Sequence, residues 1–261
     1  MLRFSANLGF LWPELPLLKR IDAAAKARFG AVELHWPFET PAKDVRAACL
    51  DNGIILLGLN TPVGDTVKGE FGLGALPARE AEFHAAFDQS LAYCVESGAR
   101  FIHTMAGLVA VDQRTKARDT LLRNLMDAAA KAKTHDLTLL LEPINPRDKP
   151  GYFYSQTSEV AAIIADVGAD NVKLMFDIYH VAISEGDVLT RFDSLLPIIG
   201  HIQIAAVPTR AEPDEGEIAY DRVLARIDER GYRGWIGCEY RPRGDTAQGL
   251  TWVQNLGLSN L

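Results

Sequence analysis

Short apolar runs alternate with longer amphipathic segments along all 261 residues of the chain. The apolar runs are nearly unbroken, which is typical of parallel strands that are covered on both faces. We predict eight such strands, at Arg3–Asn7, Ala31–His35, Ile54–Asn60, Phe101–Thr104, Thr138–Glu142, Val172–Asp177, His201–Ala205 and Trp235–Tyr240.

The segments between these runs repeat apolar residues at the spacing of one helix face. We predict helices at Leu15–Phe29, Ala42–Asn52, Ala78–Glu96, Arg114–His135, Ser158–Val167, Val188–Leu195, Tyr220–Arg230 and Thr246–Leu256. Eight strands, each followed by a helix, predict one α/β domain over residues 1–261, folded as a single (β/α)8 barrel, or TIM barrel. The alternative is an open, doubly wound sheet, but no G-x-G-x-x-G turn follows the first strand.

The charge balance is acidic, with a formal net charge of −7 and a sequence pI of about 5.4. Such a surface argues against nucleic acid, whose binding depends on Lys and Arg, but it leaves room for a small anionic molecule as substrate, which a few local cations can hold. The N-terminus lacks a signal-peptide pattern, and no stretch approaches the roughly 20 apolar residues of a membrane helix. The three cysteines, Cys49, Cys94 and Cys238, are far apart in sequence. We therefore expect a cytoplasmic protein with reduced, packed thiols and no membrane contact.

Four consecutive predicted strands carry an oxygen-bearing side chain at or near their carboxyl ends. These strands read TLLLE, KLMFD, HIQIA and WIGCE, and the side chains are Glu142, Asp177, Gln203 and Glu239. Side chains of a strand alternate between its two faces. Glu142 therefore shares a face with Leu140, and Asp177 shares a face with Met175.

Three carboxylates that converge in a barrel mouth would repel one another unless they took up protons or surrounded a cation. Carboxylate and amide oxygens favour Mg²⁺ or Mn²⁺ over zinc, which Cys and His would attract. A single acid at a strand end is more often a helix N-cap or a solvated loop residue. The spacing alone therefore leaves two interpretations open, a metal site and a set of unconnected acids.

Several longer segments resemble the hydroxypyruvate isomerase family, which belongs to the wider superfamily of xylose isomerase-like barrels. They are GEFGLGALPAREAEF (Gly69–Phe83), EPINPRDKPGYF (Glu142–Phe153), LMFDIYH (Leu174–His180), GHIQIAAVPTRAEPDEGEIAY (Gly200–Tyr220) and GYRGWIGCEYRPRG (Gly231–Gly244). The resemblance runs from the first strand to about Gly249, and its most specific parts are HIQIA…GE and GCEYRP.

The resemblance implies that one divalent metal, Mg²⁺ or Mn²⁺, is bound by Glu142, Asp177, Gln203 and Glu239. It also implies that Glu142 and Glu239 transfer protons, converting hydroxypyruvate to tartronate semialdehyde through an enediolate. A 2-oxo-tetronate isomerase would differ only in substrate length. A ketose 3-epimerase is a third alternative, although such relatives usually carry His where Gln203 stands. A nuclease of the endonuclease IV type uses several zinc ions and many His ligands, and the chain has only six His.

Two histidines near strand ends, His180 and His103, are candidates for contact with substrate oxygen, and the resemblance implies this role for His180. The carboxylate of an oxo acid also needs a cation, and a guanidinium binds a carboxylate through two hydrogen bonds. The candidate cations, all in predicted loops, are Lys68, Arg147, Lys149, Arg210 and Arg241.

The chain departs from the family in two places. Relatives commonly have Asp where this chain has Ala206, and the segment VELHWPF (Val32–Phe38) differs from the expected one. We expect His35 and Trp36 to line the mouth and to influence substrate identity.

Long loops follow predicted strands at Thr61–Leu76, Glu142–Gln156 and Val207–Glu217, which places them on the catalytic face of a barrel. Because barrel relatives often form dimers, we also expect a homo-oligomer, a dimer or higher, in which the apolar loop Phe71–Leu76 could take part.

Overall fold

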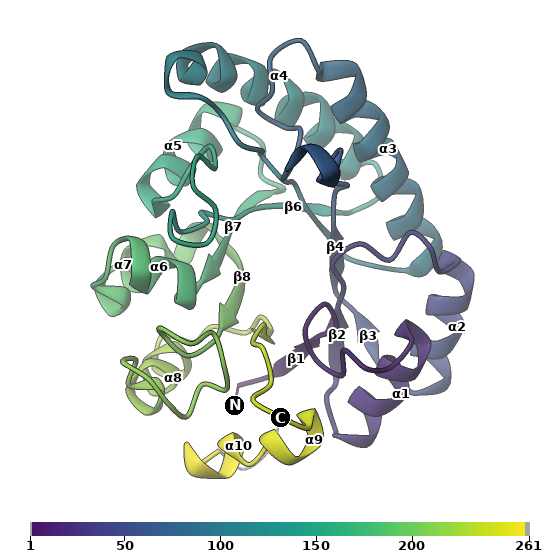
Figure 1. Cartoon of the computed structure of the whole chain (residues 1–261), viewed down its shortest axis with the longest axis vertical. Coiled ribbons are helices and arrows are strands. Elements are labelled where there is room, and N and C mark those ends of the chain that lie inside the picture. The colour runs from purple at the N-terminus through teal and green to yellow at the C-terminus, as the bar shows by residue number, and fades with distance from the viewer. Residues whose placement is uncertain (1, 259–261) are drawn as a thin grey trace.

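A computed structural model describes residues 2–258 and shows parallel strands arranged as a barrel inside a ring of helices (Figure 1). The order of the strands in the sheet is β3-β2-β1-β9-β8-β7-β6-β5-β4. Their bounds are β1 Phe4–Asn7, β2 Ala31–Glu33, β3 Ile55–Leu56, β4 Gly58–Asn60, β5 Phe101–His103, β6 Thr138–Leu141, β7 Val172–Asp177, β8 Ile199–Ile204 and β9 Ile236–Cys238. The predicted α/β fold class, a (β/α)8 barrel, is confirmed.

The predicted strand Ile54–Asn60 is divided into β3 and β4, so nine short strands build a barrel of eight. The backbone N–H of Leu34 donates to the carbonyl of Gly58 at 2.9 Å, and the N–H of Asn60 donates to the carbonyl of His35 at 2.9 Å. These bonds join the end of β2 to β4 and close the sheet on itself. Glycine is required at position 58, because a Cβ there would lie 2.5 Å from the carbonyl oxygen of Phe101.

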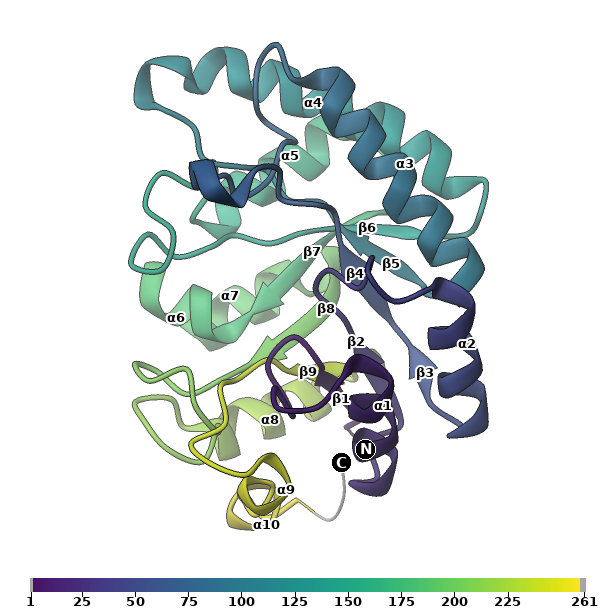
Figure 2. The ribbon, with the colours of Figure 1, turned by 45° about the vertical axis from the view of Figure 1, so that its right-hand side comes forward.

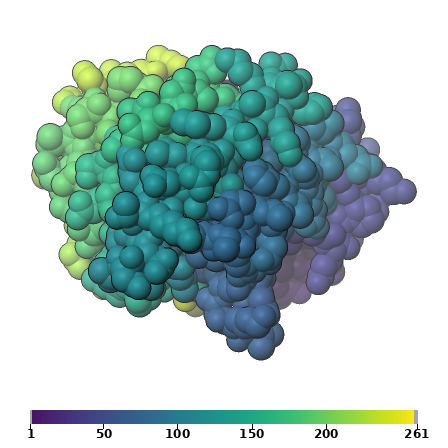
Figure 3. Space-filling model, turned by 90° about the horizontal axis from the view of Figure 1, so that it is seen from above, coloured from purple at the N-terminus to yellow at the C-terminus, as the bar shows by residue number. Residues whose placement is uncertain are grey.

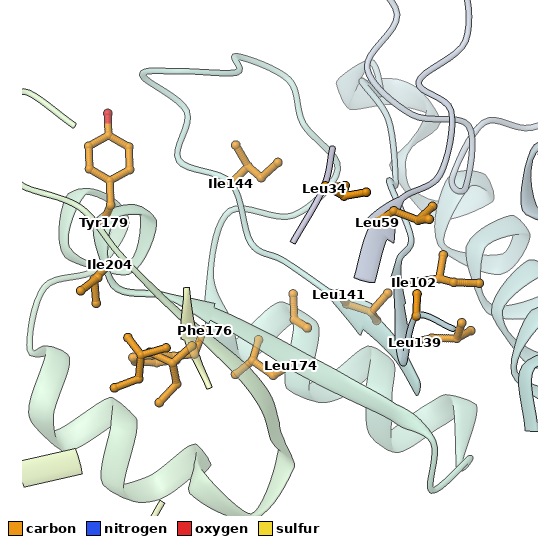
Figure 4. Packing of buried hydrophobic residues seen from close by; sticks show 14 of the residues in the cluster. Leu34, Leu59, Ile102, Leu139, Leu141, Ile144, Leu174, Phe176, Tyr179 and Ile204 are labelled. Atoms are coloured by element: carbon orange, nitrogen blue, oxygen red, sulfur yellow. The ribbon is translucent and has the colours of Figure 1, made fainter. Parts of the chain in front are cut away.

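Side chains of the strands alternate between the barrel interior and the layer beneath the helices. Leu139 and Leu141 of β6 belong to the large hydrophobic cluster, part of which Figure 4 shows beside the strands and helices. Leu140 belongs instead to a small separate cluster that also contains Met175. The predicted register is therefore confirmed, and it directs the side chain of Glu142 into the barrel.

Helices surround the strands, as the view in Figure 2 also shows. Their bounds are α1 Leu17–Lys26, α2 Ala42–Asp51, α3 Glu80–Ser97, α4 Arg114–Lys133, α5 Thr157–Val167, α6 Ile178–Ser184, α7 Val188–Leu195, α8 Tyr220–Glu229, α9 Thr246–Gly249 and α10 Trp252–Asn255, with short 3-10 helices at Thr66–Lys68, Val111–Gln113 and Leu196–Ile198. Side chains of α3 and α4, blue to teal, cover much of the face seen in Figure 3.

Two helical features differ from the sequence prediction. The short helix α6 begins directly after β7, where no separate helix was predicted. The predicted helix Thr246–Leu256 is instead the pair α9 and α10, separated at Leu250 and Thr251. Hydrophobic periodicity does not detect this break, because Leu250 at the break and Trp252 after it both pack against the core.

Among the described residues, the longest helices are too polar to form a membrane span. The three cysteines are buried free thiols, as expected. Burial raises the pKa of Cys49 to about 11 and that of Cys94 to about 12, so both thiols stay protonated near neutral pH.

We predict that Leu139→Ala lowers the free energy of unfolding by about 2–5 kcal/mol, because it leaves a cavity in the large cluster. Chemical denaturation followed by circular dichroism measures this change. Leu50→Ala is the matched control, because Leu50 on α2 is 70% exposed and its truncation removes little packing. Equal losses of unfolding free energy in the two variants would contradict the burial of Leu139 in the large cluster.

Candidate metal centre and active site

Four buried side chains meet where the last four strands end. Glu142 directly follows β6, Asp177 is the last residue of β7, Gln203 lies in β8, and Glu239 directly follows β9. Between 1% and 7% of each residue is exposed. A cavity of about 490 Å³ opens onto this group, and Glu142 and Glu239 line it.

Asp177 is both a helix cap and a member of the site. Its Oδ1 accepts a hydrogen bond of 2.9 Å from the backbone N–H of Tyr179, which caps the N-terminus of α6. Its Oδ2 is buried without a hydrogen-bond partner in the described part of the chain. The cap interpretation is therefore confirmed for one oxygen of this carboxylate, while the other oxygen is left available for a ligand.

Glu142, Asp177 and His180 have potential metal-binding atoms within 4.8 Å of one another, so the site can hold a cation. His180 Nε2 lies 3.5 Å from Asp177 Oδ2 and 3.8 Å from Glu142 Oε1. Which of the three would act as ligands depends on whether His180 presents a lone pair or an N–H to the group.

Asn145 fixes the orientation of His180. The Oδ1 of Asn145 accepts from the backbone N–H of Asp148 at 2.9 Å, so its Nδ2 faces His180 Nδ1, at 2.6 Å. Since the amide nitrogen only donates, Nδ1 of His180 is the acceptor, and the ring proton is on Nε2. His180 therefore presents an N–H to the carboxylates and acts as a donor, so the cation-binding atoms of the cluster are the carboxylate oxygens.

His103 presents the opposite arrangement. Its Nδ1 lies 3.2 Å from Asn60 Oδ1, an atom that only accepts, so Nδ1 donates and Nε2 carries the lone pair. This Nε2 is buried without a hydrogen-bond partner among the described residues and lies 3.6 Å from Glu142 Oε2. Burial lowers the pKa of His103 to about 4, and burial together with Arg210 lowers the pKa of His180 well below its usual value. Both rings are therefore neutral near pH 7.

Glu239 is held by three donors. Arg210 Nη2 lies 2.9 Å from its Oε2, while His35 Nε2 and Asn7 Nδ2 lie 2.9 and 3.1 Å from its Oε1. Arg210 also pairs with Asp148 at 3.3 Å, and its guanidinium lies over the rings of Phe10 and Tyr179, 5.0 and 4.8 Å from their centroids.

The buried acids have divergent pKa values. Burial, then the charges of Glu239 and Asp177, raises the pKa of Glu142 well above its usual range. Burial and Glu239 raise the pKa of Asp177 to about 8, against the opposing charge of Arg210. Burial alone would also raise the pKa of Glu239, but Arg210 and His35 outweigh it and lower that pKa to about 2.

Three oxygens of the group fit a metal that prefers oxygen ligands. Glu142 Oε1, Asp177 Oδ2 and Gln203 Oε1 are all buried without a hydrogen-bond partner in the described chain. Burying an oxygen without a hydrogen-bond partner costs free energy, unless another group such as a metal ion binds it. Carboxylate and amide oxygens are the ligands that Mg²⁺ and Mn²⁺ prefer.

The candidate cations lie in different places. Arg210, Lys149 and Arg241 line the cavity, whereas Lys68 and Arg147 are exposed and do not. Lys68 pairs instead with Asp65 in its own loop, at 3.2 Å. The structure therefore brings three of the predicted cations, Arg210, Lys149 and Arg241, to the site and leaves Lys68 and Arg147 outside it.

The rim of the cavity is aromatic. His35 and Trp36 line it as predicted, together with Phe10 and Phe71 from the loops after β1 and β4. Trp36 packs edge-on against Phe71, with ring centroids 6.4 Å apart. These rings give this part of the cavity wall an apolar surface.

Three polar residues of the site were not identified from the sequence, namely Asn7, Glu33 and Asn145. Glu33 ends β2 and could have been found by the rule that located the other acids, since it is an acid at a strand end. Asn7 ends β1 in the same way. Asn145 lies in a loop, 35 residues before the histidine that it contacts, and no sequence pattern joins the two.

The chain matches the family model for the xylose isomerase-like TIM barrel over residues 21–256. It is 46% identical to a 2-oxo-tetronate isomerase of Cupriavidus necator over 97% of this chain and 98% of that one. It is 36% identical to the hydroxypyruvate isomerase of Escherichia coli, again over 97% and 98% of the two chains.

Solved structures agree on the fold. A Brucella melitensis protein described as an AP endonuclease of family 2 superposes with a TM-score of 0.95 at 37% identity, over 97% of this chain and 98% of the other. A 3-keto-D-glucoside 4-epimerase of E. coli superposes with a TM-score of 0.81 at 17% identity, over 97% and 99%. This second likeness concerns the fold alone.

The chain belongs to the xylose isomerase-like TIM barrel family. Within it, the curated relatives are hydroxypyruvate isomerases and 2-oxo-tetronate isomerases, which confirms the resemblance seen in the sequence. The protein is thus an enzyme of the isomerase class, of the aldose–ketose type.

We predict that the Asp177 carboxyl contributes progressively less to the stability of the metal-free protein as pH rises from about 4 towards 8. The unfolded chain releases the Asp177 proton near pH 4, whereas the folded chain keeps it until about pH 8, so the folded state binds more protons in this window. Asp177→Asn should flatten this part of the curve, because an amide does not titrate. Urea unfolding in the presence of a chelator, at several pH values, measures both proteins. Equal pH dependences would show that Asp177 titrates normally.

Proposed function

We propose that this protein is a metal-dependent aldose–ketose isomerase that interconverts hydroxypyruvate and tartronate semialdehyde (2-hydroxy-3-oxopropanoate) through an enediolate. The observation that carries the proposal is a group of buried oxygens without hydrogen-bond partners at a cavity that is lined by Glu142 and by cations without acidic partners. Glu142 Oε1, Asp177 Oδ2 and Gln203 Oε1 supply the first set. Lys149 and Arg241 supply the second, because neither forms an ion pair with any described acid.

In this proposal Glu142, Asp177, Gln203 and Glu239 hold one Mg²⁺ or Mn²⁺. When bound, such an ion stabilises the negative charge that develops on the substrate oxygens during enolisation. Three carboxylates around one divalent ion, with Arg210 beside them, leave a nearly neutral group. The ion would thus also remove the mutual repulsion that keeps Glu142 and Asp177 protonated.

The reaction removes a proton from carbon 3 of hydroxypyruvate and returns one to carbon 2, while a hydroxyl proton passes between the two oxygens. Glu142 and Glu239 are the proposed proton carriers, because both line the cavity and approach it from different strands. His180, with its proton on Nε2, would donate a hydrogen bond to a substrate oxygen. His103, with its lone pair on Nε2, would accept one from a substrate hydroxyl.

Lys149 and Arg241 are the proposed contacts of the substrate carboxylate. Arg210 is less available for this role, since its guanidinium already binds Glu239 and Asp148. Lys149 Nζ lies 4.0 Å from the centroid of Phe71, and the guanidinium of Arg241 lies 5.7 Å from that of Phe10. Each cation is thus directed into the cavity by a ring of the aromatic rim.

The runner-up is a 2-oxo-tetronate isomerase, which performs the same chemistry on an oxo acid one carbon longer. The 46% identity to the Cupriavidus necator enzyme of that name favours it. The cavity, at about 490 Å³, has room for either substrate. A panel of hydroxypyruvate and 2-oxo-tetronates, incubated with the protein and Mg²⁺ or Mn²⁺ and followed by NMR, tests both proposals. The absence of turnover with every member would overturn them together.

We predict that Glu239→Gln lowers kcat by about 10²–10⁴-fold while the fold stays intact, because an amide does not accept the substrate proton. The same NMR assay measures turnover, and circular dichroism checks the fold. Glu14→Gln is the matched control, since Glu14 is an exposed glutamate outside the cavity. Near-normal activity of Glu239→Gln would mean that Glu239 carries no proton in this reaction.

We predict that Lys149→Gln and Arg241→Gln each raise the KM for hydroxypyruvate by about tenfold or more, which is the loss expected for one charge-assisted hydrogen bond. Dihydroxyacetone has the same hydroxymethyl ketone without the carboxylate, so its isomerisation should change little. Arg147→Gln, in the same loop but exposed and outside the cavity, serves as the control. An unchanged KM for hydroxypyruvate in both variants would place the carboxylate elsewhere.

A further inference from the structure

A second group of buried polar side chains lies next to the proposed metal ligands, inside the barrel. Its centre is Glu33, the last residue of β2, which is 2% exposed. Three donors converge on its carboxylate. Ser5 Oγ and His201 Nε2 lie 2.6 and 2.9 Å from Oε1, and Gln203 Nε2 lies 2.8 Å from Oε2.

The chemistry of these contacts leaves no freedom to the amide of Gln203. Gln203 Nε2 donates to Glu33 Oε2, and an amide nitrogen only donates, so the Gln203 atom that faces Glu33 is the NH₂ group. The carbonyl oxygen must then point the other way. That oxygen, Oε1, is buried and has no hydrogen-bond partner among the described residues.

The space for this arrangement comes from the neighbouring strand β9. A Cβ added at Gly237 would lie 2.2 Å from Glu33 Oε1 and 2.9 Å from Gln203 Cγ. Only glycine at this position lets the carboxylate and the amide lie side by side.

We propose that Glu33 is a positioning residue for the metal centre: it holds the NH₂ of Gln203 and thereby turns the carbonyl oxygen towards the ion. The inference rests on the proposed function, in which Gln203 is a metal ligand. Glutamine differs from aspartate and glutamate in having one usable oxygen, so a glutamine ligand needs such a partner, whereas the three acidic ligands do not.

The test is Glu33→Gln, which keeps the size of the side chain. Because Ser5 and His201 both donate to Oε1, the new carbonyl is expected to stay on their side and the new NH₂ to face Gln203. Two NH₂ groups repel, so the Gln203 amide turns over and directs its own NH₂ at the ion. We expect the dissociation constant for Mn²⁺, measured by electron paramagnetic resonance titration without substrate, to rise about 10–100-fold.

The double variant Glu33→Gln, Gln203→Glu provides the rescue. Its new glutamate accepts from the NH₂ of residue 33 and still offers an oxygen to the ion, so Mn²⁺ affinity should return close to the wild-type value. Gln203→Glu alone places two carboxylates in contact and should not show this recovery. If Glu33 served only in packing, the second substitution at residue 203 would not restore the Mn²⁺ affinity. If Glu33→Gln does not fold, the double variant is compared with Gln203→Glu alone. Recovery of both the fold and Mn²⁺ binding in the double variant then supports the positioning role, and no recovery overturns it.

Ser5→Ala is the matched control, because it removes another donor to Glu33 and leaves the contact with Gln203. Its Mn²⁺ affinity should change little. Equal Mn²⁺ affinity in Glu33→Gln and the wild type, or no recovery in the double variant, would overturn the positioning role and leave the proposed function standing. A wild-type protein that binds no Mn²⁺ would overturn the metal-dependent function itself, and the positioning role with it.

Discussion

The site depends on the confinement of negative charge at one end of the barrel. Glu142, Asp177 and Glu239 are all nearly inaccessible to water, and burial opposes the ionised form of each. The pKa values of the three acids shift in different directions. Arg210 and His35 keep Glu239 ionised, whereas the pKa values of Glu142 and Asp177 are raised. A divalent cation is the simplest group that would let all three ionise together.

The barrel supplies the rigid frame that this confinement needs. Each acid is fixed at the end of a strand whose alternate side chains are locked in the hydrophobic layer beneath the helices, as Leu139 and Leu141 are on β6. The polar groups that orient the site, Asn145 and Glu33, are themselves fully buried and hydrogen-bonded. The position of each reacting atom is thus set by at least two layers of contacts.

Sequence periodicity predicted the fold and brought the four central side chains to one end of the barrel, because the strand register directs residues such as Glu142 and Asp177 to one face. It left open whether these side chains bind a metal. It did not reveal that Ile54–Asn60 divides at Leu57, since that break depends on how closely Gly58 approaches Phe101. It also did not identify which loop cation enters the cavity. Lys68 and Lys149 are equivalent in a sequence, and only the path of their loops separates them.

The contact of Arg210 with both Phe10 and Tyr179 has an energetic consequence. A long, flexible side chain normally loses rotational entropy when it engages a ligand. Here the two rings and two carboxylates immobilise the guanidinium as the chain folds. The rotational entropy is therefore lost during folding, and its loss does not weaken the later binding of a ligand. A lysine could not replace it, because an ammonium group lacks the flat surface that stacks on aromatic rings.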